Sequence, residues 1–253
     1  FSRGRSLWMI SPSQRAQWDS YYDPIIKKFK EDKLTGKALA EWKYQRYMHD
    51  YMRVIHSVDR NVGRVIDYLR KHNLLDNTLI VYTSDQGFYM GEHGWFDKRF
   101  MYEESFRTPL LMYMPGGKRG DITEMVQNID YAPTFLQLAG VQVPKDIQGV
   151  SMLPLLKGKR VPWRKSLYYH YYEFPDEHNV CRHYGVKDQR YVLIHFYDDI
   201  DAWELYDLKT DPSQLNNIYG RPGTETITRN LKKELLRLQE QYDDPIRHKM
   251  VKE

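Results

Sequence analysis

Two short apolar runs constrain the fold of this chain more strongly than any other feature. Residues 78–83 read Thr-Leu-Ile-Val-Tyr-Thr, and residues 109–114 read Pro-Leu-Leu-Met-Tyr-Met. Runs of this length that are rich in β-branched and aromatic residues are typical of strands buried on both faces of a sheet. We therefore expect them to be neighbouring or near-neighbouring strands of one sheet that helices cover.

Helical patterns alternate with these runs. Apolar side chains recur every three or four residues over 47–69, which predicts one amphipathic helix over 35–72. Another helix is expected after the second run, where Pro133 suits an early helical position and Gly140 suits a helix end. This alternation predicts an α/β fold with a mainly parallel sheet covered by helices.

The two ends of the chain differ from this central part. Residues 1–34 contain Pro12 and Pro24 among mixed charges, so we expect an irregular loop there. Beyond Gly149 the composition changes, and we predict a second, smaller α+β subdomain over 150–253 with an antiparallel sheet. Its expected strands lie at 166–174, 190–198 and 203–208, and its closing helix carries Leu231, Leu235, Leu236 and Leu238.

Composition narrows the class of protein. The 38 Lys and Arg exceed the 34 Asp and Glu by only four, without a basic stripe, so nucleic acid is not an expected partner. No apolar run approaches the ~20 residues that cross a bilayer, so no membrane span is expected. A single cysteine, Cys181, excludes an internal disulfide framework. The chain starts at Phe1 without a methionine or a signal-peptide pattern, so we expect the protein to extend upstream.

The chemistry is expected where the first run ends, at Ser84-Asp85-Gln86-Gly87. Open α/β sheets bind ligands at the carboxyl ends of their strands. A carboxylate beside an amide offers two hard oxygen ligands, which suit Ca²⁺ or Mg²⁺ and suit zinc poorly. Taken alone, Asp followed closely by Gly after a strand more often forms a turn, so these four residues by themselves favour a turn over a metal site.

The elements that follow make this segment much more specific. Gly-Glu-His-Gly at 91–94 is followed by Lys98, five positions after His93, and then by Tyr102-Glu103 and by Arg107 two positions before a proline. The order resembles the sulfatases of the alkaline phosphatase superfamily. In that family a strand ends in Ser-Asp-(Asn/His/Gln)-Gly, and a Gly-x-His-Gly element and a lysine follow. Roughly residues 35–160 carry the resemblance.

The resemblance implies a fold and a set of residue roles. The chain would be the C-terminal part of an alkaline-phosphatase-like α/β catalytic domain over 1–149, followed by the smaller subdomain. Asp85 and Gln86 match two protein ligands of a Ca²⁺ ion, and Lys98 matches a lysine that contacts the sulfate as a catalytic and substrate-binding cation. The family also implies a periplasmic, secreted or lysosomal location.

The family nucleophile is a formylglycine made from Cys or Ser in a Cys/Ser-x-Pro-x-Arg sequence, and this chain does not contain that sequence. In Ser11-Pro12-Ser13-Gln14-Arg15 the proline directly follows the serine, and the segment after Cys181 has no proline at the required position. We therefore expect the formylglycine, the remaining calcium ligands and the leaving-group histidine in a missing N-terminal part of the same protein.

Several other residues are candidates for the functional site, and each also has a purely structural explanation. His93 is a candidate catalytic residue, although packing that shapes the loop is at least as plausible. His183 is a candidate substrate-binding residue, because similar sulfatases use this region for sugar specificity, and an ordinary strand histidine is about equally plausible. We expect Glu103 and Arg107 to form a structural pair that orients the loop behind Lys98.

Three functions remain open at this stage. The first is hydrolysis of sulfate esters on a sulfated sugar or glycosaminoglycan fragment, which the form of the 91–98 segment favours by resemblance. The second is hydrolysis of phosphate or phosphonate esters, which the same superfamily also carries out. The third is a non-catalytic binding module that retains the fold.

Overall fold

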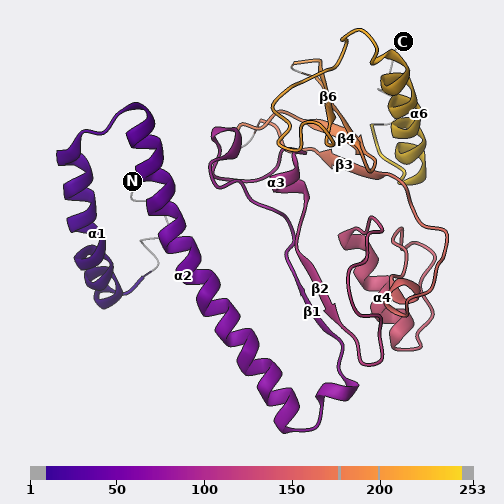
Figure 1. Ribbon diagram of the computed structural model, residues 1–253, viewed down its shortest axis with the longest axis horizontal. Coiled ribbons are helices and arrows are strands. Elements are labelled where there is room, and N and C mark those ends of the chain that lie inside the picture. The colour runs from indigo at the N-terminus through magenta and orange to yellow at the C-terminus, as the bar shows by residue number, and fades with distance from the viewer. Residues whose placement is uncertain (1–9, 176–177, 199, 247–253) are drawn as a thin grey trace. The chain divides into compact units, whose positions relative to one another are not determined.

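The computed structural model describes residues 10–175, 178–198 and 200–246, and the chain forms two compact units, Phe1–Val62 and Gly63–Glu253 (Figure 1). The long helix α2 (Gly36–Lys71) runs across the boundary between them. It confirms the helix predicted over 35–72.

The first unit begins with a helix that the sequence did not predict. Helix α1 spans Pro12–Asp32, where an irregular loop was expected, so that prediction is wrong. Ser11 caps it: its hydroxyl accepts a bond from the Gln14 amide at 3.3 Å, and its own amide donates to the Gln14 side chain at 2.9 Å. Pro12 occupies the first helical position, where a missing N–H costs no hydrogen bond.

Few side chains are buried in the first unit. Neither α1 nor α2 contains a residue classed as buried. The contacts between the two helices are aromatic and polar: the Phe29 and Trp42 rings stack at 4.3 Å, and the Tyr22 hydroxyl donates to Asp50 at 2.9 Å.

The two apolar runs of the second unit form paired strands. Strand β1 (Ile80–Thr83) pairs with β2 (Leu110–Tyr113), so the prediction that they are neighbours is confirmed. Their pairing is antiparallel, because the segment between them contains only the short helix α3 (Glu103–Phe106) and the 3₁₀ turn η3 (Glu92–Gly94), not a crossover helix.

Two further expectations about this sheet are not met among the described residues. Every strand pair that the structure describes is antiparallel, so the mainly parallel sheet remains a prediction. The strands were also expected to be buried on both faces, but alternate side chains of β2 are exposed, with Leu111 at 62% and Tyr113 at 44%. One face of the pair is therefore only partly covered and the other faces solvent.

The rest of the second unit is built around an antiparallel sheet of β3 (Leu167–Tyr171), β4 (His183–Lys187), β5 (Tyr191–Phe196) and β6 (Ala202–Asp207), in that order. Three of these strands and the antiparallel pairing confirm the prediction, whereas β4 was not predicted. Figure 1 shows helix α6 (Glu225–Gln241) along one face of this sheet, as the leucine pattern predicted.

Both faces of this sheet are buried, because alternate side chains enter two different apolar clusters. Leu193 and Leu205 pack with Leu235 of α6 on one face. Ile194 and neighbouring side chains pack with Met101, from the segment before α3, on the other. The four-stranded sheet, which we call the central sheet, therefore packs between α6 and the loop that carries Lys98.

Short helices connect the two sheets. Helix α4 (Tyr131–Leu138) follows the turn η4 (Asn128–Asp130), and α5 (Leu153–Leu156) comes after it. The fully buried Asp130 carboxylate accepts hydrogen bonds from the Val150 amide at 2.8 Å and from the Arg164 guanidinium. This bond crosses the expected domain boundary at 149/150, which remains a prediction.

No helix in the described part of the chain is long and apolar enough to cross a membrane.

Candidate functional site

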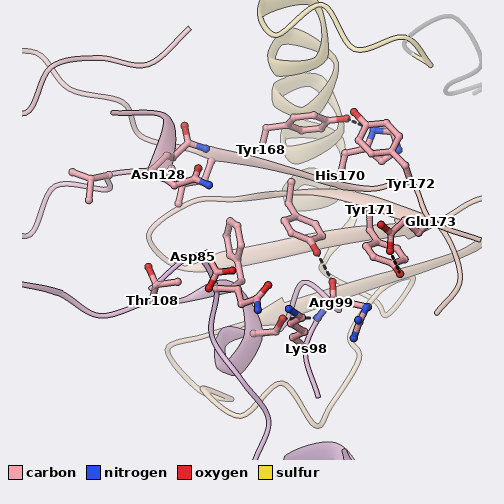
Figure 2. Close-up of a pocket in the computed structure, with 17 residues that line it drawn as sticks. Asp85, Lys98, Arg99, Thr108, Asn128, Tyr168, His170, Tyr171, Tyr172 and Glu173 are labelled. Carbon is pink, nitrogen blue, oxygen red and sulfur yellow. Dashed lines mark hydrogen bonds between the residues drawn. The ribbon is translucent and has the colours of Figure 1, made fainter. Parts of the chain in front are cut away.

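A pocket of about 660 Å³ lies between the loops that follow β1 and β2 and the edge strand β3 (Figure 2). Asp85, Gln86, Lys98 and Arg99 line it from the loops. Side chains from Leu167 to Glu173 line the opposite wall. The structure thus brings Asp85, Gln86 and Lys98 into one pocket, and their roles as metal ligands and catalytic cation remain predictions.

The Asp85–Gln86 segment is held by the glycine that follows it. The Gly87 amide donates to the Ser105 carbonyl at 2.8 Å. A Cβ atom at position 87 would lie 2.0 Å from the Glu104 carbonyl oxygen, so only glycine permits this approach of the two backbones. The glycine is therefore required by close packing and is more than a turn residue.

Asp85 and Gln86 present the kind of atoms that a hard cation binds. The Asp85 carboxylate is exposed, and the Gln86 amide is partly exposed at the pocket wall. Carboxylate and amide oxygens fit Ca²⁺, but two are fewer than the six to eight that it prefers. Among the described residues, no group of three or more His, Cys, Asp or Glu could hold a metal. The two residues fit part of a calcium shell and would need further oxygen ligands.

Lys98 reaches the same pocket from a tightly held loop. The carbonyl of Asp97 accepts a bond from the Tyr89 amide at 2.7 Å. Arg99, the next residue after Lys98, has a φ of 99°, a conformation that non-glycine residues rarely adopt. Within the part of the chain that the structure describes, no hydrogen bond or ion pair engages the Lys98 ammonium, so it can meet an anionic ligand.

The opposite wall carries a buried polar network. The His170 Nδ1 atom lies 2.6 Å from an Asp244 oxygen, and the Tyr168 hydroxyl donates to the same oxygen at 2.6 Å. Burial lowers the pKa of His170. Burial alone would raise the pKa of Asp244, but the bonds from Tyr168 and His170 lower it overall. The pKa shifts of His170 and Asp244 are both downward, and the pair is held together in the wall of the pocket.

His93 and His183 lie outside the residues that line the pocket. The His93 ring stacks on Tyr102 at 4.6 Å, and its Nε2 atom lies 3.5 Å from a Glu104 oxygen. His183 is fully buried among aromatic rings, with its Nδ1 atom 2.9 Å from the Cys181 carbonyl oxygen. Both surroundings favour the packing explanation, and the proposed roles in catalysis and substrate binding remain untested predictions.

The expected pair of Glu103 and Arg107 is not formed. The Glu103 carboxylate instead binds the Lys187 ammonium of β4, and the Glu103 amide donates to Gln214 at 2.8 Å. Arg107 contacts Glu103 only through the backbone: its amide donates to the Glu103 carbonyl oxygen at 2.8 Å. The pair was predicted from neighbours in sequence, whereas the actual partner comes from a strand that the sequence did not reveal.

Comparisons with known proteins place the chain in a family. The family model described as sulfatase matches residues 10–141, and a second, described as N-sulphoglucosamine sulphohydrolase, C-terminal, matches residues 91–241. Each covers more than half of the chain. The chain belongs to the sulfatase family.

Individual relatives refine the similarity. The chain is 51% identical to an N-acetylglucosamine-6-O-sulfatase of Bacteroides thetaiotaomicron over 94% of the chain and 44% of the relative. It is 32% identical to a multifunctional alkaline phosphatase superfamily protein of Trinickia caryophylli, over 78% of the chain and 41% of that relative. The chain thus spans less than half the length of these curated relatives.

A solved structure shares the fold closely. It is described as a complex with the substrate D-glucosamine-2-N,6-O-disulfate and matches with a TM-score of 0.88 at 48% identity. The match covers 96% of this chain and 51% of that structure. The likeness supports the α/β sulfatase fold for this part of the molecule.

Proposed function

We propose that the protein carrying this chain hydrolyses sulfate esters of a sulfated glucosamine or a related glycosaminoglycan fragment. The observation that carries this proposal is the meeting of Asp85, Gln86 and Lys98 in one pocket. The relative named as an N-acetylglucosamine-6-O-sulfatase and the solved complex with a disulfated glucosamine support the choice of substrate class.

Lys98 would act on the charge of the transferring group. Negative charge is held on the sulfuryl oxygens as the ester bond breaks, and a fixed ammonium beside them lowers the energy of that arrangement. Its effect is larger in a pocket than in water, because less solvent screens the interaction. Lys98 would thereby hold the sulfate and favour its transfer.

Asp85 and Gln86 would hold a calcium ion together with oxygen ligands from outside the described residues. When bound, the ion would neutralise charge on the sulfate oxygens and orient the sulfate toward the group that attacks its sulfur atom. Asp85 supplies charge to this site, and Gln86 supplies a neutral carbonyl oxygen. The close packing at Gly87 fixes the backbone directly after these two residues.

The nucleophile would come from outside these 253 residues. No Cys/Ser-x-Pro-x-Arg sequence occurs in the chain, so the formylglycine that the family uses would be supplied by another part of the protein. The residues of this chain would bind and orient the ester, and the covalent step would use that other part.

A second ester class is supported by one specific relative. The Trinickia protein is named as a multifunctional member of the alkaline phosphatase superfamily. A pocket with a lysine and a metal can also accept phosphate or phosphonate esters, since these share the tetrahedral shape and the anionic oxygens of a sulfate ester. Side-by-side rates on a sulfate and a phosphonate ester of the same leaving group would rank the two.

The proposal is tested by two substitutions in the complete protein. Lys98→Ala should lower kcat/KM for glucosamine 6-sulfate by about 10²–10³, the range typical of a preorganised charge-stabilising group. Asp85→Ala should abolish turnover and weaken calcium binding measured by calorimetry. Steady-state kinetics and circular dichroism would be recorded for each variant.

Lys145→Ala is the matched control, because Lys145 is exposed and lies away from the pocket. It should retain the rate of the unmodified protein. A protein that hydrolyses the phosphonate ester but no sulfate ester would contradict the proposed substrate class. Full activity of Lys98→Ala would remove Lys98 from the site.

A further inference from the structure

Ser105 bonds to two loop segments that line the pocket. We call them the Asp85–Gln86 arm, which is Asp85 and Gln86, and the Lys98 arm, which is Lys98 and Arg99. Its carbonyl oxygen accepts the bond from the Gly87 amide at 2.8 Å, directly after Asp85 and Gln86. Its hydroxyl accepts a bond from the Arg99 amide at 2.8 Å, directly after Lys98. Ser105 is buried, with 6% of its surface exposed, and it lines the pocket itself.

Arg99 is held from its other side as well. The Tyr169 hydroxyl of β3 donates to the Arg99 carbonyl, and the Arg99 guanidinium pairs with Asp97 at 2.6 Å. A residue with a φ of 99° is strained and persists only where its surroundings fix it. The bonds from Ser105 and Tyr169 supply that fixation at the peptide groups on both sides of the residue.

Ser105 itself stands on a rigid frame. It belongs to α3, whose first residue, Glu103, is bound by Lys187 of β4 and Gln214. The Tyr102 hydroxyl donates to Glu204 of β6 at 2.8 Å. The helix is therefore anchored to two strands of the central sheet.

We propose that Ser105 is a positioning residue that sets Lys98 against the Asp85–Gln86 arm, an inference that rests on the proposed function. Both arms are loop segments, so no helix or strand of their own sets the distance between Lys98 and Asp85. One buried residue that bonds to each arm fixes it. A shift of about 1 Å in a group of this kind can cost 10²-fold in rate.

The two bonds of Ser105 differ in a way that makes the inference testable. Replacing Ser105 with alanine removes the hydroxyl that holds Arg99 and leaves the carbonyl that holds Gly87. Ser105→Ala should therefore disturb the Lys98 arm and spare the Asp85–Gln86 arm. A general loss of packing would disturb both.

The experiment is a double-mutant cycle of Ser105→Ala and Lys98→Ala in the complete protein. We expect Ser105→Ala to lower kcat/KM about tenfold when Lys98 is present and less than twofold when it is absent, because the hydroxyl acts through that side chain. The Kd of inorganic sulfate should follow the same pattern, whereas the Kd of Ca²⁺ should change less than twofold.

Thr134→Val is the control for the loss of a buried hydroxyl. Thr134 is fully buried and its hydroxyl accepts a bond from the Met152 amide at 2.8 Å, but it does not line the pocket. Its effect on kcat/KM should be the same with and without Lys98. If Ser105→Ala fails to fold, Tyr169→Phe removes the other bond to Arg99 and should show the same dependence on Lys98.

Equal losses from Ser105→Ala in both Lys98 backgrounds would overturn the positioning role while leaving the proposed function intact. Absence of sulfate ester hydrolysis by the unmodified protein would instead contradict the proposed function. The sulfate Kd cycle still decides the role of Ser105 in that case, since it does not require turnover. Failure of inorganic sulfate to bind in a Lys98-dependent way would overturn the role of Ser105 and leave the proposed function to the hydrolysis assay.

Discussion

His183 shows how a single buried side chain can make the stability of the protein depend on pH. Its ring is fully buried, and its centroid lies 5.0 Å from that of Phe196 and 5.6 Å from that of Phe100. Burial lowers the pKa of His183 from 6.5 to about 4. Below pH 6.5 His183 therefore binds a proton in the unfolded chain but not in the folded chain. The free energy of unfolding falls as the pH falls toward 4.

His183→Phe should remove part of this acid sensitivity. The phenyl ring keeps the aromatic packing and takes up no proton, so the loss of unfolding free energy between pH 7 and 4.5 should shrink by about 2–3 kcal/mol. Chemical unfolding at the two pH values measures it. The same slope in His183→Phe as in the unmodified protein would show that His183 is protonated in the folded state. His72→Gln, at an exposed position, is the control.

At the residue scale, the sequence revealed the groups that are adjacent along the chain. Asp85, Gln86 and Lys98 stand in a recognisable order, and the structure places them in one pocket. Ser105 and His170 could not be predicted, because their importance depends on contacts rather than spacing. His170 meets a carboxylate 74 positions away, and no local pattern encodes such a partner.

At the element scale, periodicity was informative where one face of an element is apolar. The long helix, the strands at 80–83 and 110–113 and the closing helix were all predicted. Helix α1 was not predicted, because two prolines lie within its sequence. Pro12 occupies its first position, where proline is compatible with a helix, and Pro24 lies inside it. Strand β4 was missed because Gly185 interrupts its pattern. That glycine is required there because a Cβ would lie 2.5 Å from the backbone carbonyl oxygen of Leu193 on the neighbouring strand.

The closing helix offers a direct test of this reasoning. Leu235 of α6 is fully buried in the cluster with Leu205, so Leu235→Ala should lower the free energy of unfolding by about 2–5 kcal/mol. Leu236 is the next residue and only partly buried, and Leu236→Ala should cost roughly half of that or less. Thermal and chemical unfolding would measure both. Equal losses would mean that α6 packs with a different face against the sheet.

At the scale of the whole molecule, the pocket is assembled from segments that are far apart in the sequence. The Asp85 loop, the Lys98 loop and β3 line the same pocket, and α3 is anchored to the central sheet through the pair of Glu103 and Lys187. The sequence identified the first two segments and the sheet but not the strand pairing that unites them. Relative placement of this kind depends on tertiary contacts, which hydrophobic periodicity does not specify.

The last prediction concerns the chain on its own. Residues 1–253, purified without any other segment, should show no sulfatase activity, because no serine or cysteine has the spacing from which formylglycine is made. Lys98 and the proposed calcium ligands Asp85 and Gln86 would not replace the covalent step, since catalytic groups that act as a unit fail together when one is removed.

A chromogenic sulfate ester, assayed with and without added Ca²⁺, measures this directly, with the complete protein at the same concentration as the reference. The isolated chain should also associate, because β2 exposes Leu111 and Tyr113 on a short strand pair. Light scattering would show this. Robust hydrolysis by the isolated chain would contradict the prediction, because the reaction would then proceed without a formylglycine supplied from elsewhere in the protein.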